Sequence, residues 1–390
     1  MKKILMIAYY YPPIINVGVN RTLNFSINLE KLGYEPVILT IKDPDSRLCQ
    51  LGKKIPKNIK IYRTKSLKFK YTLINKQIDM LVGWIPFAVK KGLEIIKNEK
   101  IDLIYVSCPP WSSSIAAAIL KKLTGKPLIV DFRDGWTTNP YKDVTIFDKI
   151  LEKFVLRNAD LVITTTKDTE EQYREKFPNL KLRTIYNGTD KLRKSDPDKK
   201  EFIISYFGTY AYGRTPVNLF KAIKALDKKI KKRIRFVSFS YEDSYSRFIK
   251  KLAKKYDVDI TLINNPSNRG EIEKYLKKSS MFLLLQARTN KRENAIPYKT
   301  YEYLSTGKPI LADIPKGDII KILNENGKTH IISNNDSEGY KIFTKAIEET
   351  YKKWKKEKLK PKIKKSVKKF LFENLTKELA EELDSLTKYS

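Results

Sequence analysis

The sequence predicts the α/β fold class, with two doubly wound domains built on parallel sheets. The chain has 390 residues, which is long enough for two hydrophobic cores. Short apolar runs bounded by turn residues alternate with helical segments, as in strand-helix-strand units. This alternation stops at a charged segment, 191–200, and then starts again. We therefore expect an N-terminal domain over 1–190, a linker over 191–200, a second domain over 201–345, and C-terminal helices over 346–390 that cross back to the first domain.

The first domain is expected to begin with a buried strand. Residues 4–10 form an uninterrupted apolar run, which is typical of a central strand in a parallel sheet. The loop after it contains Gly18, but no GxGxxG pattern surrounds this glycine, so the dinucleotide-binding fingerprint is absent. A helix ending near Leu32 follows. The further strands that we expect are 35–41, 59–63, 102–108, 126–132, 161–166 and 182–190, and the further helical segments are 79–98, 109–125, 145–157 and 167–176.

The second domain is expected to repeat this pattern without repeating the sequence. Strand 202–208 runs into the loop TYAYGRTP, and a helix over about 216–229 follows. The tail, 339–390, reads as helical, with Pro361 dividing it in two. The remaining strands that we expect are 233–240, 259–265, 280–287, 309–314 and 329–335, with helices near 242–255, 269–278, 297–306 and 316–324.

The charge of the chain points to an anionic partner. Lys and Arg number 78 against 44 Asp and Glu, a net charge of +34. Nucleic acid, an anionic membrane or a phosphorylated substrate would each fit, and an AT-rich genome would also enrich lysine overall. Two local clusters stand out: 46–78 has ten Lys or Arg and no acid, and 351–370 has eleven lysines and one glutamate. The first precedes Trp84 and Phe87, a composition typical of a surface on anionic lipid; the alternative is a solvated face beside core aromatics.

Cysteine and histidine usage argues against metal and redox chemistry. Cys49 and Cys108 lie far apart without metal-ligand spacing, so we expect reduced thiols in a reducing compartment. The single histidine, His330, lies in a strand-like run and is expected to be structural. The acidic triplets 43–45 and 196–198 read as turns, so we predict no metal site. No run approaches the roughly 18 apolar residues of a membrane span, and the N-terminus reads as a strand, so we expect a cytoplasmic or peripheral protein.

The segment 293–312, ENAIPYKTYEYLSTGKPILA, is the strongest candidate for a binding site. Pro297 suits the first turn of a helix, Gly307 ends that helix, and 310–312 resembles a buried strand. The N-terminus of such a helix presents backbone N–H groups to a phosphate. Glu302, one turn further along, could then accept hydrogen bonds from a ribose diol. The alternative is that Glu302 is a solvated helix residue.

A second candidate lies where strand 126–132 ends. Arg133 and Asp134 follow this apolar run directly. Open α/β sheets bind ligands at the carboxyl ends of their strands, so these two side chains are site candidates. The alternative is that Asp131, Arg133 and Asp134 pair with one another and cap the next helix.

The order of these features resembles the GT-B glycosyltransferases of family four. Two similar α/β domains, a linker after an NGTD turn, and the segment PYKTYEYLSTGKP carry this resemblance over nearly the whole chain. PPWSS followed by KLTGKPLIVDFRDGWTTNPY looks like the branch that assembles surface polysaccharides and glycans. The resemblance implies two Rossmann-like domains facing a central cleft, a nucleotide-sugar co-substrate with no other cofactor, retention of anomeric configuration and independence of metal. It also implies a glycan or lipid-linked acceptor, and with it peripheral attachment at the inner face of the cell membrane.

The family's site residues can be carried over by position. Glu302 matches the ribose-binding glutamate of the E-x7-E motif, whose first glutamate is replaced by Asn294 with Glu293 beside it. Thr209 replaces the arginine of the glycine-arginine loop, and Arg214 stands where the family has the lysine that holds the diphosphate. The resemblance implies these roles: donor-binding Gly208, Thr209, Arg214, Ile296, Lys299 and Glu302; catalytic Arg214, Asn294, Glu293, Arg133 and Asp134; acceptor-binding Gly18, Arg21 and Trp111.

Two rival functions follow from the same sequence. A non-enzymatic nucleic-acid-binding protein would account for the charge, but the basic residues gather in two segments instead of lining a groove with aromatics. A GT-B-like sugar-nucleotide epimerase or a phosphorylase shares the architecture. Epimerases depend on acids and histidines and phosphorylases on a pyridoxal lysine, and neither pattern is present. We therefore expect an enzyme, and no nucleic acid as partner.

Overall fold

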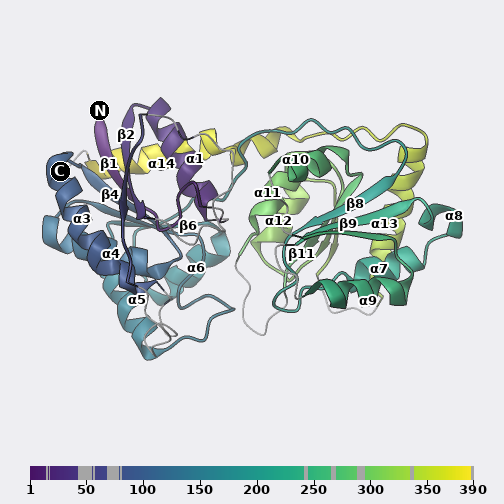
Figure 1. Ribbon diagram of the computed structural model, residues 1–390, viewed down its shortest axis with the longest axis horizontal. Coiled ribbons are helices and arrows are strands. Elements are labelled where there is room, and N and C mark those ends of the chain that lie inside the picture. Colours follow the sequence, from purple (N-terminus) through teal and green to yellow (C-terminus); the bar gives the residue numbers. More distant parts are fainter. Residues whose placement is uncertain are drawn as a thin grey trace. The chain divides into compact units, whose positions relative to one another are not determined.

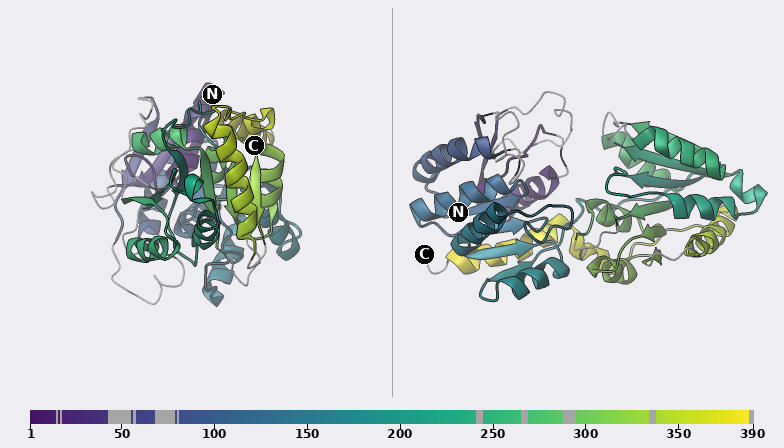
Figure 2. Two further views of the ribbon diagram at one scale, coloured as in Figure 1. Left: turned by 90° about the vertical axis from the view of Figure 1, so that its right-hand side faces the viewer. Right: turned by 90° about the horizontal axis from the view of Figure 1, so that it is seen from below.

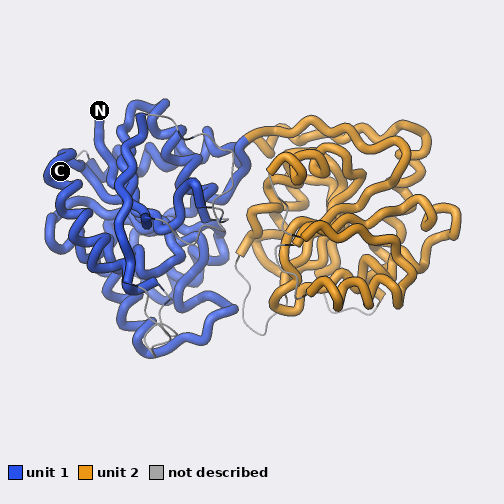
Figure 3. Tube along the Cα trace, in the orientation of Figure 1, with its two compact units in different colours: residues 1–190, 370–390 blue, residues 191–369 orange. Residues whose placement is uncertain are grey.

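The computed structural model divides into two compact units (Figure 3): unit 1 comprises Met1–Asp190 and Phe370–Ser390, and unit 2 comprises Lys191–Lys369. Each unit is a parallel sheet whose strands are joined through helices, so the predicted class of two doubly wound α/β domains is confirmed. The structure describes residues 1–14, 16, 18–42, 55, 58–67, 79, 81–240, 245–264, 269–287, 295–333 and 338–387.

Unit 1 is built on a seven-stranded parallel sheet in the order β3-β2-β1-β4-β5-β6-β7 (Figure 1). β1 (Lys2–Ile7) and β4 (Leu103–Cys108) pair at its centre, and the strand order reverses between them. Every side chain of β4 is buried, as expected of a strand covered on both faces. The other strands are β2 (Tyr34–Ile41), β3 (Lys60–Thr64), β5 (Leu128–Phe132), β6 (Leu161–Thr164) and β7 (Leu182–Thr184).

Two groups of helices cover this sheet. α3 (Ile85–Asn98) packs against α4 (Trp111–Thr124), and α4 packs against α5 (Ile146–Asn158), whereas α1 (Val19–Lys31) packs against α14 (Phe372–Thr387). Right-handed crossovers place α1 on one face and α3, α4 and α5 on the other. The remaining helices are η2 (Val82–Trp84) and α6 (Lys167–Lys176).

The C-terminal segment returns to unit 1. The ring of Phe372 meets that of Phe25 edge to face, with centroids 5.7 Å apart, and Leu371 bridges to Thr189. Apolar side chains of α14 thus bury themselves against α1, which supplies the main favourable free energy for docking a terminal helix.

Unit 2 contains a six-stranded parallel sheet in the order β10-β9-β8-β11-β12-β13. β8 (Phe202–Phe207) pairs with β11 (Met281–Leu285) at the point where the order reverses, and all side chains of both strands are buried. The other strands are β9 (Ile234–Ser240), β10 (Ile260–Asn264), β12 (Ile310–Asp313) and β13 (Thr329–Ile332). The helices are α7 (Val217–Lys224), α8 (Lys228–Lys231), α9 (Ser246–Tyr256), α10 (Arg269–Lys278), α11 (Tyr298–Leu304), α12 (Asp318–Asn326), α13 (Tyr340–Lys355) and η4 (Lys365–Phe370).

The core of unit 2 is rich in aromatic rings. Phe202 contacts Tyr351 and Trp354, each with centroids 5.6 Å apart, and so fixes α13 to the sheet. α13, the yellow-green helix in the left view of Figure 2, packs against α7 and β13. Gly307 has a φ of +69°, and a Cβ there would lie 2.6 Å from the backbone of Lys362. This glycine therefore ends α11 and leaves room for the chain that leads back to unit 1.

Several element boundaries differ from the predictions. The predicted helix 216–229 is divided into α7 and α8, because Asp227 caps a new helix start through the N–H of Lys229. The predicted strand 182–190 ends at Thr184 in β7. The tail is not continuously helical: Glu357 has a φ of +53°, and Pro361 lies in the extended stretch that follows.

Trp84 is a core residue of unit 1 and not part of a lipid-facing surface. It is fully buried, its Nε1 donates to Thr64 Oγ1 at 2.7 Å, and its ring meets that of Tyr9. The alternative of core aromatics beside a solvated face is therefore correct for this residue. The basic segment before it falls largely outside the described residues. Within the described part of the chain, no helix has the length and apolarity that crossing a membrane requires.

Candidate functional site

The predicted donor-site residues of unit 2 gather at the carboxyl end of β8. Gly208 follows β8 directly with a φ of +147°, a value that favours glycine. The hydroxyl of Tyr206 donates to the carbonyl oxygen of Thr209 at 2.7 Å and closes the turn. This edge of the sheet, beside the point where the strand order reverses, is where open α/β sheets bind ligands.

Lys299 comes from α11 and reaches this turn. Its Nζ lies 4.1 Å from the centre of the Tyr206 ring, and a Cβ on Gly208 would lie 2.7 Å from it. Burial, together with the charge of Arg214, lowers the pKa of Lys299 well below its ordinary value. In the described part of the chain the Lys299 ammonium contacts the Tyr206 ring and pairs with no acid.

Arg214 adds a second cation to this place. It lies in the loop between β8 and α7, its guanidinium carbon is 5.8 Å from the centre of the Tyr212 ring, and its Nε is buried without a hydrogen-bond partner among the described residues. Two neighbouring cations without a counter-charge repel each other, so the arrangement favours an anion that would neutralise both.

Glu302 forms ion pairs with two arginines that the sequence analysis did not identify. The Glu302 side chain is almost fully buried, and Oε1 accepts a hydrogen bond from Arg269 Nη2 and lies 3.6 Å from Arg193 Nη2. Burial, the largest single effect, opposes charging of Arg269, but the charge and hydrogen bond of Glu302 together with the charge of Glu273 raise the pKa of Arg269. The alternative of a solvated Glu302 is therefore wrong.

The two arginines also share a second carboxylate. Glu273 of α10 pairs with Arg193 at 3.0 Å and with Arg269 at 2.9 Å, and these contacts lower the pKa of Glu273 against the opposing effect of burial. Arg193 further donates from its backbone to the carbonyl of Ser305, just after α11. A signal was present in the sequence, because Arg269 and Glu273 are spaced i, i+4 on a predicted helix. Only the fold shows that Glu302 completes the cluster.

The entry to α11 is described from Ala295 onward. Ile296 is buried, and the carbonyl of Ala295 accepts from Gln286 Nε2 at 2.6 Å. Pro297 is the residue just before the first helical residue, Tyr298, one position earlier than the predicted place in the first turn, and its side chain makes no capping hydrogen bond. Glu293 and Asn294 lie outside the described residues.

In unit 1 the structure brings Gly18 and Arg133 together. A Cβ on Gly18 would lie 2.1 Å from Arg133 Nη1, so this glycine provides the space that the guanidinium fills. Arg133 also donates from Nε to the carbonyl of Cys108 at 3.4 Å and from Nη2 to that of Pro109. The chain segments that follow β1, β4 and β5 thus meet here, and two residues that the sequence analysis proposed separately, Gly18 and Arg133, lie side by side.

Arg21, which was predicted to bind the acceptor, is a buried residue of unit 1. It is 2% exposed, pairs with Asp131 at 2.6 Å and 3.0 Å, and donates to the carbonyls of Ile185 and Tyr186. Tyr105 donates to the same carboxylate. Asp131 therefore pairs with Arg21 and not with Arg133, and we assign Arg21 a structural role, because its guanidinium is already surrounded by protein acceptors.

Asp134 and Trp111 lie near the same edge of unit 1. Burial raises the pKa of Asp134 against the opposing charge of Arg133, and no hydrogen bond or ion pair joins its carboxylate to the described residues. Trp111 stacks on Trp136 with centroids 5.8 Å apart, and its Nε1 is buried without a partner in the described part of the chain. Lys142 Nζ lies 5.2 Å from the Trp111 ring centre.

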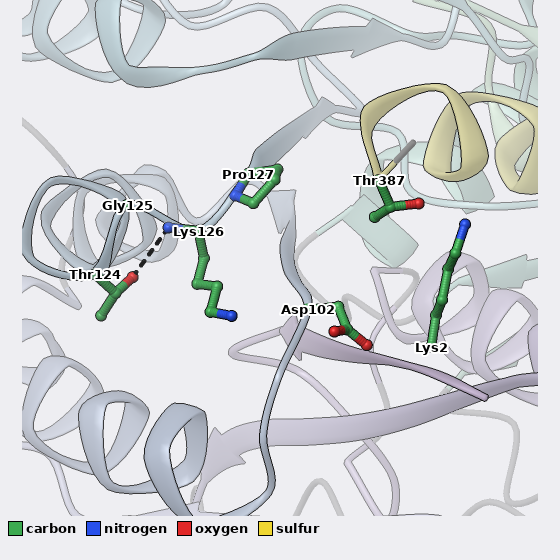
Figure 4. A pocket seen from close by; sticks show the side chains of 7 residues that line it. All are labelled: Lys2, Asp102, Thr124, Gly125, Lys126, Pro127 and Thr387. Carbon is green, nitrogen blue, oxygen red and sulfur yellow. Dashed lines mark hydrogen bonds between the residues drawn. The ribbon is translucent and has the colours of Figure 1, made fainter. Parts of the chain in front are cut away.

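Two other features lie away from these sites. The cavity in Figure 4 is lined by Lys2, Asp102 and Pro127 at the amino ends of strands, together with Thr387 of α14. This edge is opposite to the one where parallel sheets bind ligands. His330 lies on β13, as expected for a structural residue, and burial lowers its pKa.

Comparison with known protein families covers both units. Residues 18–193 match the family described as Glycosyltransferase Family 4, and residues 188–370 match Glycosyl transferases group 1. No curated protein matches the chain.

Solved structures resemble the whole chain at low sequence identity, which shows a shared fold. Sucrose-phosphate synthase from Thermosynechococcus elongatus has a TM-score of 0.74 at 16% identity, covering 100% of both chains. HepE from Anabaena, in complex with UDP and glucose, has a TM-score of 0.69 at 14% identity, covering 99% of this chain and 100% of its own. The lipopolysaccharide outer core galactosyltransferase WaaB has a TM-score of 0.64 at 13% identity, covering 99% of both chains.

The two family matches join end to end and together span the chain from the Gly18 loop to the start of α14. They occur in the order of the two α/β units, and solved structures of the same two-domain fold, sucrose-phosphate synthase and WaaB among them, resemble the chain over nearly its whole length. The chain therefore belongs to the family-four glycosyltransferases of GT-B architecture.

Proposed function

We propose that this glycosyltransferase moves a hexose from a nucleoside-diphosphate sugar to a glycan or lipid-linked acceptor, with retention and without a metal ion, in surface polysaccharide or glycoconjugate biosynthesis. The observation that carries the donor assignment is the unpaired cation pair Lys299 and Arg214 beside the carboxyl end of β8. A diphosphate supplies the negative charge that this pair lacks, and the two cations stabilise the same charge as it develops on the leaving group.

Glu302 is proposed to bind the ribose. Its Oε1 is held by Arg269 and Arg193, whereas Oε2 accepts no hydrogen bond from the described residues. The two arginines fix the orientation of the carboxylate, so Oε2 is available to the ribose hydroxyls. Lys299 lies about one turn before Glu302 on α11, so the cation and the carboxylate emerge from the same face of the helix, where a diphosphate and its ribose could bind side by side.

The metal-free proposal rests on the same residues. Side-chain cations at the diphosphate provide the neutralisation that a divalent ion gives other glycosyltransferases. Retention follows from the family likeness, in which the leaving phosphate itself helps to take the acceptor proton. No histidine is then needed as a general base, which agrees with the place of the single histidine, His330, within strand β13.

The acceptor is proposed to bind to unit 1. Arg133 meets Gly18 at the carboxyl edge of its sheet, Asp134 follows Arg133 in the chain, and the carboxylate of Asp134 has no partner in the described part of the chain. A carboxylate and a guanidinium suit the hydroxyls of a sugar acceptor. The net charge of +34 favours work at an anionic surface, and we propose peripheral attachment at the inner face of the cell membrane.

Nucleotide-dependent stabilisation tests the donor assignment. Thermal unfolding is measured with UDP, GDP, UDP-glucose, GDP-mannose and inorganic phosphate, and one nucleoside diphosphate should raise the midpoint far more than phosphate does. The same nucleotide series with Arg214→Ala should show a clearly smaller rise in the midpoint at equal nucleotide concentration, because one charge-assisted contact to the diphosphate is lost. An unfolding midpoint that no nucleotide raises would refute the donor site. Release of a free epimerised sugar in place of a transfer product would favour the alternative function, a sugar-nucleotide epimerase.

A further inference from the structure

Helix α5 (Ile146–Asn158) has an unusual distribution of side chains. Its two acids, Asp148 and Glu152, are fully buried, while Ile146, Phe147 and Ile150 are 64%, 53% and 57% exposed. A surface helix normally turns its apolar stripe inward and its charges outward. Here three large apolar side chains in the first turns face solvent.

The orientation of α5 is fixed by hydrogen bonds and not by loose packing. Asp148 forms a capping box with Thr145 and accepts from Trp136 Nε1 at 2.8 Å. Glu152 accepts from the N–H of Thr137 at 3.0 Å and from the hydroxyl of Tyr173 at 2.7 Å. Turning the apolar side chains inward would leave these buried carboxylates without their partners, which is costly.

The exposed face of α5 is also basic. Lys149, Lys153 and Arg157 are exposed, and none of them pairs with an acid among the described residues. Each residue of an α-helix turns the chain by 100°, so residues spaced by about four positions share one stripe of the surface. This stripe of α5 is apolar at the start of the helix, with Ile146 and Ile150, and basic after it, with Lys153 and Arg157. Exposed apolar side chains next to unpaired lysine and arginine are the composition of a helix that lies in the interface of an anionic membrane.

The position of α5 connects this face to the acceptor edge of unit 1. Lys142, just before the helix, pairs with Asp148 and lies over the Trp111 ring, and Trp111 stacks on Trp136. The start of α5 therefore lies at the same edge of the sheet as the ends of β4 and β5, which carry the proposed acceptor residues.

We propose that the exposed face of α5 docks unit 1 onto an anionic lipid bilayer, with Ile146, Phe147 and Ile150 in the interface and Lys149, Lys153 and Arg157 among the headgroups. The inference rests on the proposed function for its purpose: docking at this edge presents the acceptor site to a hydroxyl carried by a membrane-anchored, anionic lipid. A second copy of the chain is a poorer occupant, because pairing two such faces brings like charges together.

Vesicle flotation tests this surface. The wild-type chain is compared on vesicles of phosphatidylglycerol with phosphatidylcholine and on phosphatidylcholine alone. The triple variant I146S/F147S/I150S should lose about tenfold or more in partitioning onto the anionic vesicles, because it removes three interfacial apolar side chains. K149E/K153E should lose about as much at low salt and less at high salt, since headgroup attraction is screened.

Phe248→Ser is the matched control. Phe248 is 51% exposed on α9 of unit 2, and its loss should leave partitioning onto the vesicles unchanged.

Each alternative has its own result. Wild-type partitioning by the triple variant, or no partitioning of the wild type onto anionic vesicles at low salt, would overturn the proposal. A wild-type dimer in solution that the triple variant abolishes would assign the face to self-association instead. Thermal stabilisation by a nucleoside diphosphate measures donor binding to unit 2 independently of membranes. Failure of membrane docking and failure of the donor assignment are therefore distinguishable.

Discussion

The two units contrast in how they hold their buried cations. In unit 1, Arg21 is surrounded by acceptors: Asp131 accepts two of its hydrogen bonds, and backbone carbonyls and the side-chain oxygen of Asn187 accept the rest. In unit 2, Lys299 and Arg214 lie together with no acid paired to either in the described part of the chain. A paired cation stabilises the fold, whereas an unpaired one is held at a cost that a bound anion can offset.

Unit 2 contains both kinds, which sharpens the contrast. Arg193 and Arg269 are paired with Glu302 and Glu273, about one turn of α11 from the unpaired Lys299. The paired arginines therefore act as positioning residues for the Glu302 carboxylate, while the unpaired cations are the groups left for a ligand. Substitutions on the two sides should affect different measurements.

The largest expected effect is on stability and lies in unit 1. Arg21→Ala leaves Asp131 buried without its counter-charge, which should cost about 3–5 kcal/mol in the free energy of unfolding. Chemical denaturation measures it. The matched control is Arg174→Ala, since Arg174 is 54% exposed and pairs with Glu170 on the surface, so its loss should cost only about 0–1 kcal/mol. Equal effects of the two changes would contradict the structural role of Arg21.

The next effect is on transfer and lies in unit 2. Arg214→Ala and Glu302→Gln should each lower the rate of sugar transfer by about ten- to a hundredfold, as expected for losing a charge-assisted contact worth about 1.5–3 kcal/mol, while the fold is retained. Initial rates and nucleotide affinity are measured for each variant. Lys251→Ala, an exposed lysine on α9, is the control that should keep wild-type values. Wild-type turnover in both site variants would refute the site assignment.

A smaller effect concerns pH. The pKa of Lys299 is lowered well below its ordinary value in the ligand-free protein. At pH values above this lowered pKa, the Lys299 amine is therefore mainly neutral when no ligand is bound. A bound diphosphate favours the protonated form, so binding takes up a proton and affinity for the nucleoside diphosphate should fall as pH rises, by at most about tenfold per pH unit. Titration calorimetry, at pH values where the diphosphate itself is fully ionised, measures this change of affinity with pH. Lys299→Met should bind more weakly and lose this slope; an unchanged slope would place the proton elsewhere.

The smallest expected effect is that of chelation. If side-chain cations neutralise the leaving diphosphate, EDTA should leave the transfer rate unchanged. Loss of turnover on chelation, restored by magnesium or manganese, would show that the cation pair of unit 2 is not sufficient.

Local patterns in the sequence predicted most of the architecture. Buried strands are short apolar runs and helix ends are marked by glycine and proline, so the order of strands and helices along the chain, and a helix beginning beside Pro297, followed from short stretches of chain. The meeting of Gly18 with Arg133 was also predictable, because carboxyl ends of neighbouring parallel strands share one edge. Errors were confined to boundaries, such as the division of 216–229 by the Asp227 cap.

Only the tertiary structure decided the partners of the buried charges. Arg21 pairs with Asp131, 110 positions away, and Arg269 with Glu302, 33 positions away. Sequence reasoning assigned Arg21 to the acceptor and left Arg269 unnoticed, because a charged side chain carries no local mark of what lies opposite it. The outward face of α5 was equally hidden, since the helix orients by hydrogen bonds from Thr137 and Tyr173 to Glu152. Periodicity is a property of neighbouring residues, whereas charge pairing depends on which loops the folded sheets bring together.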